Sequence, residues 1–473
     1  MNHAGEPVSK SREARGGFFW TTLGVGVQAG MQIPVLAVLA RHISPEEFGI
    51  ANAALLVIGL GLNVFEGGVA LNVAQRKNID LRDEAVAFQI SVVLALAVLG
   101  VVTSTSGLLS GFFGRPEIKP AIVVVAWSFL LSGLTAVAEA LLYNRGAYRT
   151  AASVNIVSYV VGYAAVAVIL ALKGYSYWSL IYAQITMKLV KLGLLLGWAR
   201  HAVWVRPTLA VWREHLGQTL AFSLGRVATY LANEGDMIVV GRILGVEALG
   251  FYGRAHQLMM VPNKVFIKVA IRVSTPLYAS IQDDLPRVGR AFLHSVRLTN
   301  QAMIPVTAYL VLFRREIVQV LLGPSWSEVT ALLAILAVAG FFHVIYKVPL
   351  SVMHAQRLAR NSAFSQSIFA VCLLLAVLAV ASRGLPAVAW AVTTVTAANY
   401  VFISSQIVRR LGVAPAAYLQ AHLPGLLGGG LLLAAVLLLR AVLDGALSAV
   451  AIAALGGLAL AAVVGGSLRR FLL

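Results

Sequence analysis

Residues 233–254 read NEGDMIVVGRILGVEALGFYGR. Two acids, Glu234 and Asp236, stand inside an apolar run that breaks at a short polar turn and then resumes. The Arg, Glu and Gly of this turn (242–250, RILGVEALG) recur 201 positions earlier in residues 41–49, RHISPEEFG. Coincidence is the alternative, because Gly and Arg are common at helix ends. An internal duplication is common in membrane transporters, and it predicts a chain built from two similar units.

Two weaker echoes follow the first one in the same order. Residues 113–116 (FGRP) parallel residues 322–324 (LGP), and residues 145–149 (RGAYR) parallel residues 357–360 (RLAR). The order of the echoes favours duplication of a long unit over a chance match of one turn.

Composition assigns the chain to membrane proteins. It is 59% hydrophobic and 12% charged, with a mean hydropathy of +0.84, whereas soluble chains average about 25% charged residues. The net charge of +18 lies in short loops between apolar runs, where it orients a membrane protein, so it does not indicate nucleic-acid binding. The single cysteine, Cys372, excludes an internal disulfide.

Apolar runs of about 20 residues suit membrane-spanning α-helices. The predicted fold class is an all-α polytopic membrane protein with about 14 transmembrane helices, in two six-helix lobes related by pseudo-twofold symmetry plus two C-terminal helices. The predicted spans are 17–40, 49–73, 86–110, 118–142, 151–172, 177–199, 219–241, 250–274, 291–313, 327–351, 362–382, 386–408, 424–442 and 445–466.

Loop charges predict the orientation. With a cytoplasmic N-terminus, inner segments hold 19 Lys and Arg and outer loops hold nine, which favours an even number of spans and both termini in the cytoplasm. The predicted organisation is a cytoplasmic segment, an N-lobe, an inner linker, a C-lobe and an appended helix pair that ends in the cytoplasm: residues 1–16, 17–199, 200–218, 219–408 and 409–473.

Several function classes lack their sequence signals. The longest loop has about 20 residues, too few for a folded catalytic domain. The sequence has no phosphate-cradling GxxxxGK[ST] loop and no Cys/His metal cluster. Asp283 and Asp284 are interpreted as a solvated turn beside Pro286. We therefore expect no enzymatic activity, no metal and no cofactor, apart from H⁺ or Na⁺ as a coupling ion.

Nine of the 37 cations remain outside the loop counts above. Lys188 and Lys191 lie near the inner end of the sixth span, where we expect their side chains to snorkel to the interface. The other seven lie in the second half, and each costs roughly 2.5–3.5 kcal/mol if it faces lipid at midplane. The deeper ones must therefore face a hydrated cavity or a counter-charge. These seven are Arg226, Arg254, Lys264, Lys268, Arg272, Arg297 and Lys347.

Lys264, Lys268 and Arg272 are spaced to share one face of the eighth span. The alternative is that this stripe marks the inner end of the span. A cation-rich cavity implies an anionic ligand. The candidate residues for binding it are Arg226, Arg254, Lys264, Lys268, Arg272 and Lys347, the last grouped with His343 and Tyr346 in the tenth span.

Acids inside spans are candidates for ion coupling, with internal ion pairs as the alternative. We favour a functional role for Glu66 and a local pair with Arg145 for Glu139. Glu234 and Asp236 either neutralise Arg226, which shares a helix face with Tyr230, Asn233 and Glu234, or act with the substrate; both options stay open.

Four stretches resemble bacterial polysaccharide exporters of the Wzx type, which belong to the multidrug/oligosaccharidyl-lipid/polysaccharide superfamily. They are residues 41–54 (RHISPEEFGIANAA), 235–262 (GDMIVVGRILGVEALGFYGRAHQLMMVP), 272–284 (RVSTPLYASIQDD) and 321–326 (LLGPSW). The resemblance covers roughly residues 15–410. It implies two six-helix lobes around a V-shaped central cavity, alternating access, and an undecaprenyl-pyrophosphate-linked sugar moved from the inner to the outer leaflet.

The resemblance also implies a bacterial cytoplasmic membrane protein whose partners are the lipid-linked anionic oligosaccharide, membrane lipids and other polysaccharide-assembly proteins, with no nucleic acid; we expect a monomer. Two alternatives remain. A drug or small-metabolite cation antiporter of the same superfamily would carry acids in its cavity when its substrates are cationic. A membrane-embedded polysaccharide-assembly enzyme would carry a large outer loop or catalytic acids in a loop.

Overall fold

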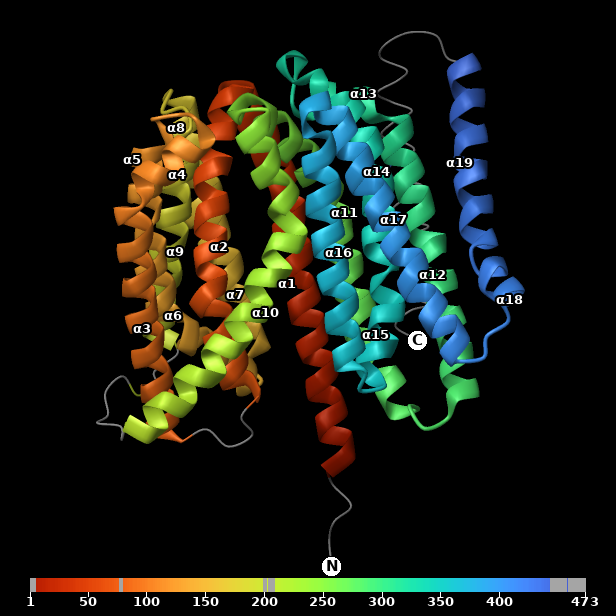
Figure 1. Ribbon diagram of the computed structural model, residues 1–473, viewed down its shortest axis with the longest axis horizontal. Coiled ribbons are helices and arrows are strands. Elements are labelled where there is room, and N and C mark those ends of the chain that lie inside the picture. Colours follow the sequence, from red (N-terminus) through yellow and green to blue (C-terminus); the bar gives the residue numbers. More distant parts are fainter. Residues whose placement is uncertain (1–5, 76–79, 199–201, 203–208, 443–456, 458–473) are drawn as a thin grey trace, which may run out of the picture. The chain divides into compact units, whose positions relative to one another are not determined.

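The computed structural model describes residues 6–75, 80–198, 202, 209–442 and 457, and shows helices joined by short turns (Figure 1). No strand occurs among these residues, so the prediction of an all-α chain is confirmed for them. Within this part, nine helical segments are long and apolar enough to cross a membrane. The predicted fourteenth span, 445–466, lies almost wholly outside the described residues, and the count of fourteen stays a prediction.

Contacts divide the chain into two compact units, residues 1–250 and 251–473. The boundary falls inside a helix, α11, shortly after its start. The division into lobes at residues 199 and 218 stays a prediction. The helices of the first unit are α1 (Glu6–His42), α2 (Pro45–Gln75), α3 (Leu81–Ser104), α4 (Ser106–Phe113), α5 (Ile118–Val125), α6 (Trp127–Asn144), α7 (Tyr148–Val157), a π-helix (Ser158–Ala165), α8 (Val166–Leu172), α9 (Trp178–Trp198), α10 (Leu209–Ile243) and the start of α11 (Val246–Ser280).

The first unit is built around α2, which packs against α3, α5, α6 and α10. Phe65 on α2 and Phe129 on α6 are fully buried and meet edge to face, with ring centroids 6.4 Å apart. Tyr230 of α10 donates its hydroxyl to the Leu56 carbonyl of α2 at 2.9 Å. A Cβ at Gly59 would lie 2.5 Å from that hydroxyl, so α10 is fitted closely to α2.

The two echoed turns have the same local structure and contact each other. Helix α2 begins at Pro45 and α11 begins at Val246, again 201 positions apart. A Cβ at Gly49 would lie 1.7 Å from the Val246 carbonyl oxygen, and a Cβ at Gly250 would lie 1.9 Å from the Pro45 carbonyl oxygen. In each contact, the glycine of one turn lies against the carbonyl of the first helical residue of the other turn. The two turns are therefore related by a local two-fold axis. This reciprocity supports duplication over coincidence.

The other echoes are also structural. Gly114 and Gly323 both take left-handed backbone, with φ of 70° and 93°, which glycine adopts without steric cost. The third echo is in a different register from the one that the sequence suggests. Gly146 and Arg357 are the left-handed residues of their turns, with φ of 73° and 57°. Arg357 is therefore structurally equivalent to Gly146, whereas the sequence comparison aligned it with Arg145.

The second unit contains most of α11 and all the helices that follow it. Its core packs α12, α14, α15 and α17 around Phe292, Tyr346 and Ile403, each at most 1% exposed. Asp284 caps α12 by accepting the Arg287 backbone N–H at 3.0 Å, and Asp283 and Asp284 are exposed, so the solvated turn is confirmed. The helices are α12 (Leu285–Leu312), α13 (Arg314–Leu321), a 3₁₀ turn (Pro324–Trp326), α14 (Glu328–Ile345), α15 (Lys347–Ala355), α16 (Ala359–Val380), a 3₁₀ turn (Ala381–Arg383), α17 (Leu385–Arg410), α18 (Pro415–Gln420) and α19 (Leu423–Val442).

Candidate functional site

Three of the predicted site residues lie on α10. Arg226 is exposed. Glu234 is half-buried within electrostatic reach of the Tyr230 phenol, and Asp236 is 2% exposed. Because Tyr230 bonds to α2, Glu234 lies beside the α2 contact. The Glu66 side chain lies outside the described part of the structure, so its role in ion coupling stays a prediction.

Helix α11 carries four predicted cations. Arg254 is half-buried and donates from Nη1 to Oε1 of Gln257, less than one turn later. Lys264 is exposed. The side chains of Lys268 and Arg272 lie outside the described residues. Next to Lys264, Asn263 is buried and donates to the Gly340 carbonyl at 3.2 Å, which fixes α11 against α14.

Lys347 begins α15 directly after an interruption in the tenth predicted span at Tyr346. Its ammonium contacts the Tyr346 hydroxyl and lies 4.3 Å from the centroid of the Tyr346 ring. Tyr346 itself is 1% exposed and meets the His343 ring edge to face, with centroids 5.5 Å apart. The structure therefore brings together the three residues that the sequence grouped in this span.

Two further histidines complete a group that we name the α14–α15 cluster: Lys347, His343, His354 and His256. His343 lies within electrostatic reach of Lys347 and of His256 on α11, and His354 lies within reach of Lys347. His354 is also 2.9 Å from the Ser362 hydroxyl of α16. His256 was missed by sequence analysis because nothing in the pattern of α11 relates it to α14. The cluster combines one permanent positive charge with imidazole N–H donors, which suits a phosphate group.

A second charged group lies in the first unit, and its ion pair differs from the predicted one. Nζ of Lys191 on α9 lies 2.6 Å from Oε2 of Glu139 on α6, and the two side chains are 12% and 22% exposed. Asn155 of α7 donates to the other carboxylate oxygen at 3.4 Å. Lys188, 8% exposed, is within electrostatic reach of the same carboxylate.

Two predictions about these residues are wrong. Lys191 does not snorkel, because its ammonium pairs with the Glu139 carboxylate between α9 and α6. Lys188 does not reach solvent either, because it is buried beside the same carboxylate. Glu139 does not pair with Arg145. The Arg145 guanidinium instead pairs with Glu84 at the start of α3, a side chain that is 4% exposed, and the other Glu84 oxygen accepts the Ala202 backbone N–H at 3.3 Å.

Among the described residues, no group of three or more His, Cys, Asp or Glu side chains is placed to hold a metal ion. The α14–α15 cluster offers a cation and hydrogen-bond donors that can recognise a negative charge.

Comparisons with known proteins show relatives that are named for polysaccharide biosynthesis. The succinoglycan biosynthesis transport protein ExoT of Rhizobium meliloti is 26% identical over 326 residues, which are 68% of this chain and 65% of that protein. The lipopolysaccharide biosynthesis protein WzxC of Escherichia coli is 22% identical over 333 residues, 69% of this chain and 66% of that protein. The chain thus matches slightly less than two thirds of the length of these two relatives.

Solved structures share the fold. The lipid II flippase MurJ, in an inward closed conformation, matches with a TM-score of 0.73 at 14% identity, over 96% of this chain and 98% of that chain. An inward-facing multidrug resistance transporter of the MATE family, from the MOP superfamily, matches with a TM-score of 0.60 at 14% identity, over 82% and 96%. At these identities the likeness shows the fold alone.

A family model described as "Polysaccharide biosynthesis protein" matches residues 38–331, more than half of the 473 residues. The resemblance noted in the sequence is therefore confirmed. The chain belongs to the polysaccharide biosynthesis protein family.

Proposed function

We propose that the protein moves an undecaprenyl-pyrophosphate-linked oligosaccharide, the repeat unit of a surface polysaccharide, from the inner to the outer leaflet of the bacterial cytoplasmic membrane. Two six-helix lobes around a V-shaped cavity, with fourteen spans and both termini in the cytoplasm, would do this by alternating access. The family and the names of the relatives support the class of substrate. The relatives are named for transport and biosynthesis of polysaccharides, and we propose no catalytic step.

The observation that carries the proposal is the α14–α15 cluster. Lys347 is half-buried at a helix interruption, with imidazoles of two neighbouring helix segments close to it. A cation inside a membrane protein is costly unless it faces a counter-charge or a wet cavity. A pyrophosphate supplies that counter-charge, and its oxygens accept from both the ammonium and the imidazole N–H groups.

Coupling to H⁺ or Na⁺ remains part of the proposal, with Glu66, Glu234 and Asp236 as the candidate residues. So does a monomeric protein that cooperates with other polysaccharide-assembly proteins. Arg226, Arg254, Lys264, Lys268 and Arg272 remain candidates for further contacts with the anionic substrate.

The first test is Lys347→Gln in cells that depend on this protein for surface polysaccharide. We expect at least about a tenfold loss of export, since a charge-assisted hydrogen bond is worth roughly 1.5–3 kcal/mol. Lys347→Arg should retain part of the activity, because the charge remains. The matched control is Lys119→Gln, which removes an exposed charge at the start of α5. Normal export by Lys347→Gln at equal membrane abundance would remove the cluster from the proposed site.

A further inference from the structure

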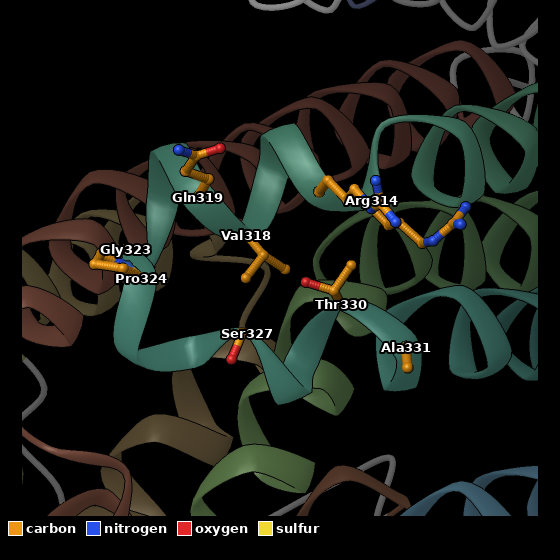
Figure 2. A pocket seen from close by; sticks show the side chains of 9 residues that line it. Arg314, Val318, Gln319, Gly323, Pro324, Ser327, Thr330 and Ala331 are labelled. Atoms are coloured by element: carbon orange, nitrogen blue, oxygen red, sulfur yellow. The ribbon is translucent and has the colours of Figure 1, made fainter. Parts of the chain in front are cut away.

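The second unit has a cavity of about 630 Å³ between α13 and the start of α14. The described residues that line it all come from the stretch 314–331, which contains the LLGPSW motif. Figure 2 shows Arg314 and Thr330 on facing helices at one end of this hairpin, and Gly323 and Pro324 at the other. The left-handed Gly323, with φ of 93°, makes the turn that brings the two helices face to face.

The lining of this cavity is cationic. It includes the side chains of Arg314, Arg315 and Gln319 on α13, with Ser327 and Thr330 at the start of α14. No carboxylate is among the described residues that line it. The nearest acid on α13, Glu316, is within electrostatic reach of Tyr309 on α12 instead. The N-terminal end of an 18-residue helix, α14, adds its positive dipole to this wall.

The two arginines differ in how they are held. Nη1 of Arg314 donates to the Val311 carbonyl at the end of α12 at 2.7 Å, so this residue also caps a helix. Arg315 is exposed, so its guanidinium is accessible to a ligand in the cavity.

The echoed turn in the first unit is arranged differently. There, Arg115 follows the left-handed Gly114, and its guanidinium is paired with Glu46 at the start of α2. An acid of the protein therefore neutralises the basic turn in the first unit. The turn in the second unit opens onto a cavity whose described lining has two arginines and no acid.

The length of α12 indicates where the cavity lies across the membrane. This helix has 28 residues, so its ends lie about 42 Å apart at 1.5 Å per residue. The hydrocarbon core of a bilayer is about 30 Å thick. If the Asp284 end lies among the headgroups of one leaflet, Arg314 and the cavity after it lie among the headgroups of the other. In the predicted topology this is the outer leaflet.

We propose that the α13–α14 cavity binds the phosphate group of a lipid in the leaflet at this end of the protein. Guanidinium groups bind phosphate oxygens bidentately, and the hydroxyls of Ser327 and Thr330 complete the donor set. Two lipids offer this chemistry, an anionic phospholipid and the undecaprenyl pyrophosphate of a flipped substrate. Only the second source rests on the proposed function.

The test is native mass spectrometry of the full-length protein in detergent, titrated separately with phosphatidylglycerol, undecaprenyl pyrophosphate and a neutral glycosyl diacylglycerol without phosphate. Arg315→Gln removes a charge without touching the cap of α12. Ala331→Glu places a carboxylate against the arginines, at an exposed position near the start of α14 where an acid suits the helix dipole. Arg383→Gln is the matched control, an exposed arginine of the same unit that does not line the cavity.

We expect Arg315→Gln and Ala331→Glu each to weaken binding of a phosphate-bearing lipid about tenfold, with the neutral lipid and Arg383→Gln unchanged. If only the binding of undecaprenyl pyrophosphate is weakened, the cavity is an exit site for the substrate. If the binding of phosphatidylglycerol is weakened, with or without that of undecaprenyl pyrophosphate, the cavity is a lipid phosphate site independent of transport. Unchanged binding of both lipids in both variants, or an equal loss in Arg383→Gln, overturns the proposal. Since no step of this assay requires transport, failure of the proposed function would leave its result intact.

Discussion

Replacing Gly49 with alanine tests the reciprocal contact between the two echoed turns. The new Cβ would lie 1.7 Å from the Val246 carbonyl oxygen. An ordinary contact needs about 3.5 Å, so α2 and the start of α11 must separate by roughly 1.8 Å. Overpacking a tight interior costs about 1–3 kcal/mol. Backbone cannot rotate away as a side chain can, so we expect the upper end, about 3 kcal/mol.

Gly250→Ala should cost about as much, because its Cβ would lie 1.9 Å from the Pro45 carbonyl oxygen. The double variant should cost less than the sum of the two, because one separation of the helices accommodates both methyl groups. The control is Gly107→Ala in α4, where a Cβ meets nothing within 4 Å. Alanine there should be neutral or stabilising by up to about 1 kcal/mol.

The assay is thermal unfolding of the purified protein in detergent. The fraction that remains folded at each temperature is measured as the monodisperse peak in size-exclusion chromatography. We expect the unfolding midpoint to fall in Gly49→Ala and in Gly250→Ala, and not to fall in Gly107→Ala. Wild-type midpoints for both variants would refute the close approach of the two turns, and strictly additive losses would refute their sharing of one contact.

Two further predictions concern the first unit. Glu139→Gln should destabilise the protein by roughly 3 kcal/mol, since it leaves Lys191 and Lys188 without their carboxylate inside the bundle. The additional substitution Lys191→Met should recover part of this loss. A thermal midpoint of Glu139→Gln equal to that of the wild type would contradict the ion pair. Tyr230→Phe should cost about 1 kcal/mol for the lost hydrogen bond to the Leu56 carbonyl, measured by the same assay, and a cost of zero would place the hydroxyl elsewhere.

The sequence allowed the all-helical fold to be predicted because apolar runs and polar turns are local signals. The 201-residue offset also predicted the equivalent starts of α2 and α11. It could not predict that Gly49 and Gly250 meet, because a spacing in the sequence carries no information about which turns pack together. The π-helix at Ser158–Ala165 has no distinct sequence period, and it was missed.

The charged groups show the same limit. Lys347, His343 and Tyr346 were grouped correctly, since they are neighbours in the sequence. The partner of Lys191 depends on how α9 packs against α6, and sequence spacing does not encode that packing. For the same reason Arg145 was assigned to Glu139, five residues from the end of its own helix, while the structure pairs it with Glu84 on α3.

The most direct measurement of the central claim is flipping in proteoliposomes. Undecaprenyl-pyrophosphate-linked oligosaccharide would be placed in one leaflet, and its appearance in the other would be followed with a sugar-oxidising enzyme that does not cross the bilayer. We predict flipping by the wild-type protein and by Lys119→Gln, reduced flipping by Lys347→Arg, and at least about a tenfold lower rate for Lys347→Gln. Equal rates for Lys347→Gln and the wild type, or no flipping by the wild type above protein-free vesicles, would contradict the account.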